Sequence, residues 1–302
     1  MLIDSVMGFC DSEYRNAHKD VRCADCLHSG ECSRNCKDCL EEIHYPSRHP
    51  NGKKFYDCPH LINFYVCDYT YKYATEIYRL LQKSDALTKI NRYSIFSIGC
   101  GACPDLMAFE LYLQKNNLNK TIEYQGIDKN PLWEPIHNQI RNYNNDKITY
   151  INLSTEDAFE FLEQFAVCDI NVLVLQYIIS ALYISGGSSL VEKLFDLIVD
   201  SIVKLKNNSE PFVILINDVN SKNMGRDLFL NLKNKLQSAG FQVCYTQYYF
   251  DRNIQVEAHR YGIKHEKSVA MNGKMVRKYL QYEPWQFCTS AQLLIEIGGD
   301  DK

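Results

Sequence analysis

Seven short runs of apolar residues alternate with helical stretches between residues 94 and 297, and this alternation constrains the fold of the 302-residue chain most strongly. The first five runs are continuously apolar, as is typical of strands that helices cover on both faces of a sheet. Such strand–helix alternation predicts a doubly wound, mostly parallel α/β sheet of seven strands. The predicted strands are 94–98, 122–127, 148–151, 170–175, 212–216, 241–249 and 293–297.

Helical periodicity separates most of these strands. Thr155 is a predicted N-terminal cap, and Gly240 is predicted to end the last helix. The alternation stops after residue 249, so the final strand is expected to close the sheet in an antiparallel hairpin with the strand before it. The predicted helices are 69–81, 105–114, 132–143, 155–165, 188–205 and 224–238.

Residues 94–106, SIFSIGCGACPDL, combine an apolar strand, a glycine-rich turn and the start of a helix. Pro104 suits the first helical turn, where its missing N–H costs no hydrogen bond. Gly99 and Gly101 let the backbone turn sharply and leave room for a ligand to lie against it. A Gly-x-Gly pair at this place predicts a ligand site at the carboxyl end of the sheet.

The second strand ends in an acid, in the segment IEYQGID of residues 122–128. A carboxylate at the tip of the neighbouring strand can accept hydrogen bonds from both hydroxyl groups of a ribose. Asp128 is therefore predicted to lie beside the glycine turn and to hold a ribose.

At SIGCGAC (97–103) and GID (126–128) the chain resembles the class I S-adenosylmethionine-dependent methyltransferases. The resemblance in element order covers roughly residues 90–300. It implies a seven-stranded sheet with a glycine-rich loop after the first strand, and S-adenosylmethionine as the cofactor. The cofactor-binding residues that it implies are Ser97, Gly99 and Gly101 at the turn, Asp128 at the ribose, Glu156 and Asp157 at the adenine, and Gln176 and Tyr177 beside the reactive methyl group.

The chain departs from that family at two positions. Ser97 stands where the family usually has an acid, and Cys103 replaces the third glycine. A nicotinamide-dependent dehydrogenase is a structural rival, but Pro104 occupies the third glycine position of its G-x-G-x-x-G spacing. A catalytically inactive relative that serves as a binding or assembly protein stays an open alternative.

Methyl transfer from a sulfonium needs the nucleophile, methyl carbon and leaving sulfur held in line, and needs a base only for a protonated acceptor. The fourth strand ends in LQYIIS, without the Asn-Pro-Pro-aromatic signature that the family uses for exocyclic amines, so no catalytic base is assigned. Asn217, Asp218 and Asn220 follow the fifth strand and are candidates to face the acceptor. Turn and cap chemistry is the alternative role for these three residues.

Thirteen cysteines are present, and eight of them lie in the first 67 residues. Paired Cys-x2-Cys turns present thiolates in the geometry of a tetrahedral zinc site. An iron–sulfur cluster and redox thiols are the alternatives. This pattern divides the chain into a metal-binding module at 1–68 and a methyltransferase domain at 69–302. The predicted ligands are Cys10, Cys23, Cys26, Cys32, Cys36, Cys39, Cys58 and Cys67, with His44, His49 and His60 nearby.

The composition excludes several classes of protein. The formal net charge is -4 and no run of residues is apolar enough for a spanning helix, so no membrane is expected as a partner. The acid at Asp4 does not fit a signal peptide, and the chain is expected to be cytoplasmic. The segment 252–278 carries seven basic and two acidic residues, and could follow a phosphate backbone or form a solvated loop. The extra module favours a large acceptor, RNA or protein.

Overall fold

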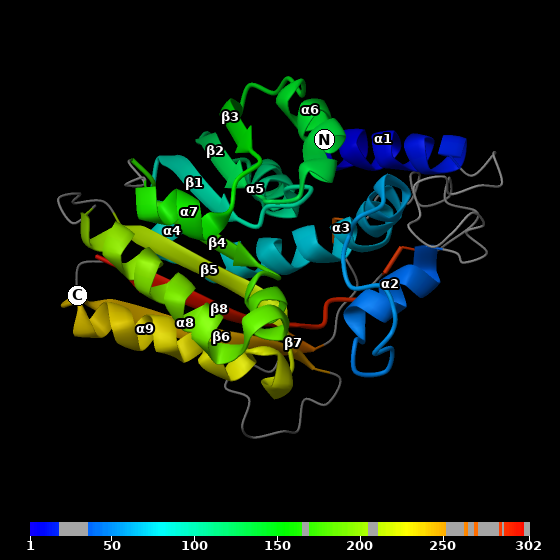
Figure 1. The fold of residues 1–302 in the computed structure, drawn as a ribbon. Coiled ribbons are helices and arrows are strands. Elements are labelled where there is room, and N and C mark those ends of the chain that lie inside the picture. Colours follow the sequence, from blue (N-terminus) through cyan, green and yellow to red (C-terminus); the bar gives the residue numbers. More distant parts are fainter. Residues whose placement is uncertain are drawn as a thin grey trace.

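One twisted sheet forms the centre of the protein, with helices on both of its faces (Figure 1). The computed structural model describes residues 1–17, 36–164, 169–204, 211–251, 263–264, 269–270, 284–285 and 287–298. The strands are β1 (Arg92–Ile98), β2 (Thr121–Ile127), β3 (Ile148–Ser154), β4 (Val172–Gln176), β5 (Phe212–Val219), β6 (Val243–Asp251), β7 (Ile263–Lys264) and β8 (Ser290–Ile297).

The sheet order is β3-β2-β1-β4-β5-β8-β6-β7. The strands from β3 to β5 are parallel, and β8 lies antiparallel between β5 and β6. The prediction of a mostly parallel, doubly wound sheet of class I methyltransferase type is confirmed for its seven long strands. The structure adds the two-residue β7, which pairs parallel to the end of β6 and which periodicity could not reveal.

Helices connect most of the parallel strands, as the alternation predicted. Three short 3-10 turns, at Pro131–Trp133, Lys222–Met224 and Arg226–Leu228, lead into helices or link them. The α-helices are α1 (Leu2–Ala17), α2 (Cys36–His44), α3 (Pro59–Leu81), α4 (Ala86–Lys89), α5 (Pro104–Lys115), α6 (Glu134–Arg141), α7 (Ala158–Gln164), α8 (Ile179–Lys204) and α9 (Phe229–Ser238).

Each face of the sheet has its own core. Helices α1, α3, α5 and α6 cover one face, where Tyr93 and Ile95 of β1 are buried. Helices α7, α8 and α9 cover the other face, where Phe96 and Ile98 of the same strand are buried. Because both faces of β1 are covered, its side chains from Tyr93 to Ile98 are all buried, including two serines.

Four predicted helix starts are corrected. Helix α3 begins at Pro59 rather than at 69, and α9 begins at Phe229 rather than at 224, after two 3-10 turns. Helix α7 begins at Ala158 rather than at Thr155, and the Asp157 carboxylate, not Thr155, accepts the Phe159 N–H at 2.9 Å. Helix α8 begins at Ile179, before the predicted start at 188, because two helical segments join across a kink at Gly187 (φ 69°).

Helix α1 packs into the core on the face covered by α3, α5 and α6, which we call the main core. Leu2, Val6 and Met7 are fully buried against α3 and α5, and each such apolar side chain contributes about 1.5–3 kcal/mol. Helix α3 runs without interruption through the predicted boundary at residue 68 (Figure 1). The division into two domains stays a prediction. Within the described residues, no helix is both long and apolar enough to span a bilayer.

Candidate functional site

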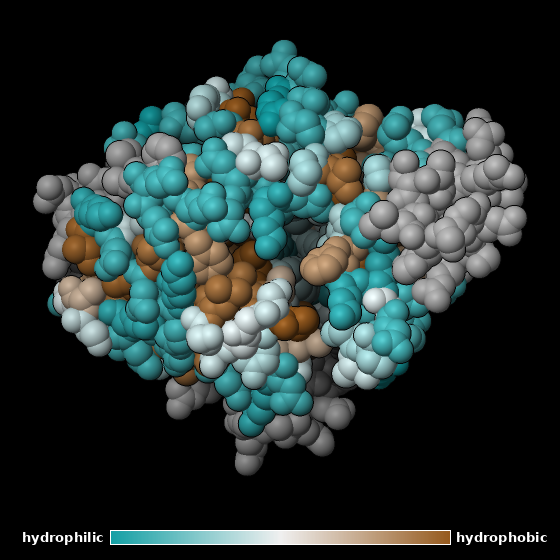
Figure 2. Space-filling view, in the orientation of Figure 1, coloured by the Kyte–Doolittle hydropathy of each residue, from teal (hydrophilic) through white to brown (hydrophobic). Residues whose placement is uncertain are grey.

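The chain changes direction across the sheet between β1 and β4. From β1 it adds β2 and β3 on one side, and then β4 and β5 on the other. Ligands of open α/β sheets bind at such a switch point, outside the carboxyl ends of the strands. The molecular surface is hollowed between this edge and the helices α2 and α3 (Figure 2).

The glycine turn after β1 has the backbone conformation that the sequence predicted. Gly99 (φ 68°) and Gly101 (φ 50°) both lie in the left-handed region that favours glycine. The N–H groups of Gly99 and Cys100 donate to the Ile127 carbonyl at 2.8 and 3.0 Å, so the turn is held against the end of β2. A Cβ atom at Gly101 would lie 3.6 Å from the Trp133 ring.

Asp128 lies beside this turn, as predicted. Its Oδ2 accepts the Gly101 N–H at 3.1 Å, and its Oδ1 accepts the Asn130 N–H at 2.9 Å. The Trp133 indole N–H also donates to this carboxylate. Burial raises the pKa of Asp128, against these hydrogen bonds, which favour its ionised form.

Ser97 is 1% exposed at the end of β1 and hydrogen-bonds to the Asp105 carboxylate. Asp105 lies in the first turn of α5 and also accepts the Tyr124 hydroxyl at 2.9 Å. Burial raises the pKa of Asp105 to about 6. Residue 97 is a serine and not an acid, but Asp105 of α5 places a carboxylate next to it.

Gln176 and Tyr177 end β4 at the same edge. Tyr177 has a left-handed backbone (φ 57°), and its N–H donates to the Asn217 carbonyl at 2.8 Å. Gln176 donates through Nε2 to the Tyr73 carbonyl at 3.0 Å, while its buried Oε1 has no hydrogen-bond partner. That unpaired oxygen is a free acceptor beside the switch point.

Glu76 of α3 is fully buried and connects three strands at this edge. Its Oε2 accepts the Tyr177 hydroxyl at 2.8 Å and the Asn217 Nδ2 at 3.1 Å. Its Oε1 accepts the backbone N–H groups of Thr289 and Ser290 at 2.8 and 3.2 Å. Four donors thus hold one carboxylate between the ends of β4, β5 and β8.

The three residues predicted to face an acceptor lie at the end of β5. Asn217 has no exposed surface, and its Oδ1 accepts from Ser290 and Gln292. Asp218 is also fully buried and accepts the Ser180 N–H at 3.0 Å at the start of α8. Asn220 accepts from Arg226 at 2.7 Å. In this conformation the side chains of Asn217 and Asp218 are buried and form hydrogen bonds within the fold, and a role toward an acceptor stays a prediction.

The two predicted adenine contacts follow β3. Glu156 is exposed and Asp157 is half-buried. Asp157 already caps α7, so Glu156 is the more accessible of the two carboxylates. Both lie beyond the carboxyl end of β3, two strands from β1 in the sheet order.

An aromatic wall, which we define as Tyr65, Tyr69, Tyr73 and Tyr177, adjoins the switch point. Tyr69 and Tyr73 stack with ring centroids 5.5 Å apart, and the Tyr73 and Tyr177 centroids are 4.3 Å apart. The Lys72 ammonium lies 5.2 Å from the ring centroids of both Tyr73 and Tyr177, within cation–π distance. Lys72 is 6% exposed, and its Nζ lies 3.9 Å from Glu76 Oε1.

The predicted metal ligands of the N-terminal segment are described only in part. Cys23, Cys26 and Cys32 lie outside the described residues. Cys36, Cys39 and Cys58 are buried in one cluster with Leu40, Leu61 and Phe64, whereas Cys10 and Cys67 are buried in the main core.

The histidines near these cysteines differ in their surroundings. Both ring nitrogens of His44 are engaged by tyrosine hydroxyls, Tyr56 at 2.9 Å and Tyr69 at 3.4 Å. Burial, with a further contribution from Lys72, lowers the pKa of His44 to about 4. His49 and His60 are half-buried. The metal module therefore stays a prediction.

Sequence reasoning missed Glu76, Lys72 and His137. The sequence predicts a helix over 69–81, and most of the side chains in that stretch are buried. A usable signal was present, because Lys72 and Glu76 are charged residues four apart within an aromatic stripe.

No family model matches this chain, and no curated protein does. Among solved structures it is similar to the plantazolicin methyltransferase BpumL in complex with a triazolic desmethylPZN analog and SAH. Identity is 14%, the match covers 87% of this chain and 98% of that one, and the TM-score is 0.46. The plantazolicin methyltransferase BamL, in complex with the same two ligands, gives 12% identity, 97% and 100% coverage and a TM-score of 0.44.

The bifunctional kinase-methyltransferase WbdD gives 11% identity and a TM-score of 0.40, over 86% of this chain and 46% of that one. Likenesses of 11–14% identity with TM-scores below 0.5 do not assign an activity to this chain.

Proposed function

We propose that this protein is an S-adenosylmethionine-dependent methyltransferase. The observation that carries the proposal is the pairing of two left-handed glycines with Asp128 at the switch point of the sheet. Gly101 leaves the backbone side of the turn free of a side chain, and the half-buried Asp128 places its carboxylate beside it. This arrangement suits an elongated ligand that carries a ribose.

The residues at the edge fit the groups of this cofactor. The Asp128 carboxylate can accept from one ribose hydroxyl in addition to its three present donors, because two oxygens offer about four lone-pair sites. The unpaired Gln176 Oε1 is a buried acceptor that suits an ammonium group. When bound, the cofactor would supply an electrophilic methyl group on a sulfonium. Gln176 and Tyr177 would orient the reacting groups, and Glu156 would lie toward the adenine.

The acceptor is proposed to be a macromolecule, either RNA or protein. The aromatic wall and the half-exposed Trp285, whose ring centroid lies 6.3 Å from that of Tyr69, supply flat surfaces beside the switch point. Such surfaces suit a base or a peptide side chain. Most of the basic segment 252–278 lies outside the described residues, so its role stays a prediction.

A noncatalytic binding protein is the second candidate. It is favoured by the extent to which Asn217, Asp218 and Glu76 are already used in hydrogen bonds within the fold. Such a protein would bind the cofactor without turnover. Incubation with cell extract and methyl-labelled S-adenosylmethionine separates the two candidates, because only an enzyme transfers label. Ribonuclease or protease treatment of the labelled fraction then identifies the acceptor class.

Calorimetric titration tests the cofactor site directly. Gly101→Val should abolish S-adenosylmethionine binding, because a branched side chain strains a left-handed backbone and fills the space against Trp133. Asp128→Ala should weaken binding by about 1.5–3 kcal/mol, the range for a hydrogen bond to a charged group. Gly240→Val (φ 89° at the opposite edge) and Asp146→Ala (an exposed acid) are the matched controls. Unchanged affinity in both site variants would contradict the assignment.

A further inference from the structure

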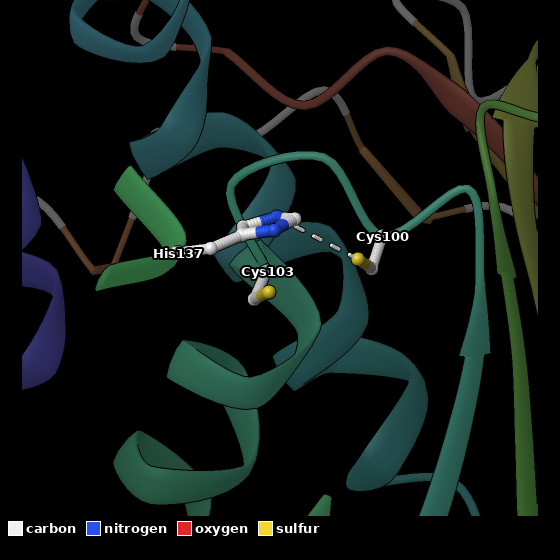
Figure 3. A group of neighbouring side chains, drawn as sticks. All are labelled: Cys100, Cys103 and His137. Carbon is white, nitrogen blue, oxygen red and sulfur yellow. Dashed lines mark hydrogen bonds between the residues drawn. The ribbon is translucent and has the colours of Figure 1, made fainter. Parts of the chain in front are cut away.

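Cys100, Cys103 and His137 lie close together at the glycine turn after β1 (Figure 3). Cys100 lies in the turn itself, Cys103 immediately precedes α5, and His137 comes from α6. One ligand atom from each residue lies within 4.8 Å of the other two, and Cys100 Sγ is 4.0 Å from His137 Nε2. None of the three side chains is more than 4% exposed. Within the part of the chain that the structure describes, no other three candidate metal ligands lie so close together.

The hydrogen bonds of His137 leave one of its nitrogens unused. Its Nε2 lies 2.7 Å from the Gly101 carbonyl oxygen. A carbonyl oxygen only accepts, so Nε2 carries the proton and donates it. Nδ1 is then an unprotonated nitrogen, buried and without a hydrogen-bond partner, whereas the nitrogen 4.0 Å from Cys100 Sγ is Nε2. A buried polar atom without a partner is uncommon in proteins and calls for an explanation. A metal bound at Nε2 would replace its hydrogen bond to Gly101, and the ring proton would move to Nδ1.

Two thiols and an imidazole are a ligand set that zinc accepts. Zinc lies about 2.3 Å from thiolate sulfur and about 2.0 Å from imidazole nitrogen, so two tetrahedral thiolates are about 3.8 Å apart. Ligand atoms within 4.8 Å of one another therefore need to approach by about 1 Å or less. A Cys-x2-Cys pair on one tight turn with a histidine from a second element is a recurrent arrangement in zinc sites.

We propose that Cys100, Cys103 and His137 bind one Zn²⁺ ion through two thiolates and an imidazole nitrogen. Binding releases the two thiol protons to solvent and leaves the fourth position for an oxygen ligand. Such an ion would join the β1–α5 turn to α6. It would bind whether or not the protein transfers methyl groups, and it is separate from the N-terminal cysteines.

The test counts bound metal in full-length protein that is purified anaerobically and titrated with Zn²⁺. Native mass spectrometry should find one equivalent fewer in Cys100→Ser, Cys103→Ser and His137→Asn than in wild type. Cys288→Ser, an equally buried cysteine, is the matched control and should keep the wild-type number. Because any N-terminal ions are common to all variants, the difference reports only this site.

Titration with Co²⁺ gives a second readout. Thiolate-to-cobalt absorption should decrease in both cysteine variants and stay unchanged in the control. If a serine variant does not fold, Cys100→Ala and Cys103→Ala replace it, with circular dichroism as the check. Equal metal content in all variants would overturn the proposal. A Cys100–Cys103 disulfide in the anaerobic wild-type protein would also overturn it, since oxidised sulfurs do not bind zinc.

Discussion

Replacement of Glu76 by glutamine should destabilise the fold more than most conservative changes. The carboxylate accepts four hydrogen bonds, two at each oxygen. A glutamine offers one oxygen and one NH2 group. The NH2 group must then face two hydrogen-bond donors, which are either the Tyr177 hydroxyl and the Asn217 amide or the backbone N–H groups of Thr289 and Ser290. The Tyr177 hydroxyl can rotate to accept. The Asn217 amide cannot turn over without loss, because its Oδ1 already accepts from Ser290 and Gln292.

Between one and two hydrogen bonds to a charged group are therefore lost. At about 1.5–3 kcal/mol each, Glu76→Gln should lower the free energy of unfolding by about 1.5–6 kcal/mol. Urea denaturation followed by circular dichroism measures this difference. Glu123→Gln is the control, because Glu123 is on the same sheet but forms an exposed ion pair with Arg92 at 3.1 Å. Such pairs contribute about 1 kcal/mol or less.

A double-mutant cycle with Tyr177→Phe tests the cause. The two substitutions should not be additive, because the Tyr177 hydroxyl donates to a carboxylate in the wild type and can only accept from a neutral amide in Glu76→Gln. Glu76→Gln with the stability of wild type would refute the reasoning. So would strict additivity with Tyr177→Phe, since the carboxylate would then not be held by that hydroxyl.

Two further predictions concern pH and metal. Burial raises the pKa of Asp105 from 3.8 to about 6, so its contribution to stability is present below pH 4 and lost as pH rises through 6. The wild-type free energy of unfolding should therefore fall by about 3 kcal/mol over this pH range because of Asp105, and Asp105→Asn should abolish that part of the decrease. Denaturation at several pH values measures it, with exposed Asp146→Asn as the control. Chelation of metal should make the segment between α1 and α3 protease-sensitive while both helices stay protected. Cys39→Ser should have the same effect and exposed Cys244→Ser none; limited proteolysis that is indifferent to chelator would contradict the N-terminal zinc site.

The strands and the glycine turn were predictable because their causes are local. A continuous apolar run needs only its own residues to indicate a strand buried on both faces. Likewise, Gly99 and Gly101 reveal a left-handed turn at the positions that need it. Boundaries were less accurate, because the cap of α7 depends on which of two polar side chains, Thr155 or Asp157, turns toward the helix.

The contacts of the site were not predictable in the same way. Glu76 meets Asn217 and Ser290 across sequence separations of 141 and 214 residues. The Cys100–Cys103 pair was visible as a Cys-x2-Cys, but its third member comes from α6. Helical periodicity places His137 on a buried face without showing what faces it. Long-range polar contacts follow from the packing of whole elements, which periodicity does not specify.

Helix α3 links the N-terminal cysteines mechanically to the candidate site. Its first turns pack Leu61 and Phe64 against Cys36, Cys39 and Cys58. Its later turns carry Lys72, Tyr73 and Glu76 to the ends of β4, β5 and β8. A single continuous helix transmits a displacement at one end to the other, because its backbone hydrogen bonds resist bending. Order in the cysteine-rich segment therefore bears on how Tyr177 and Gln176 are held.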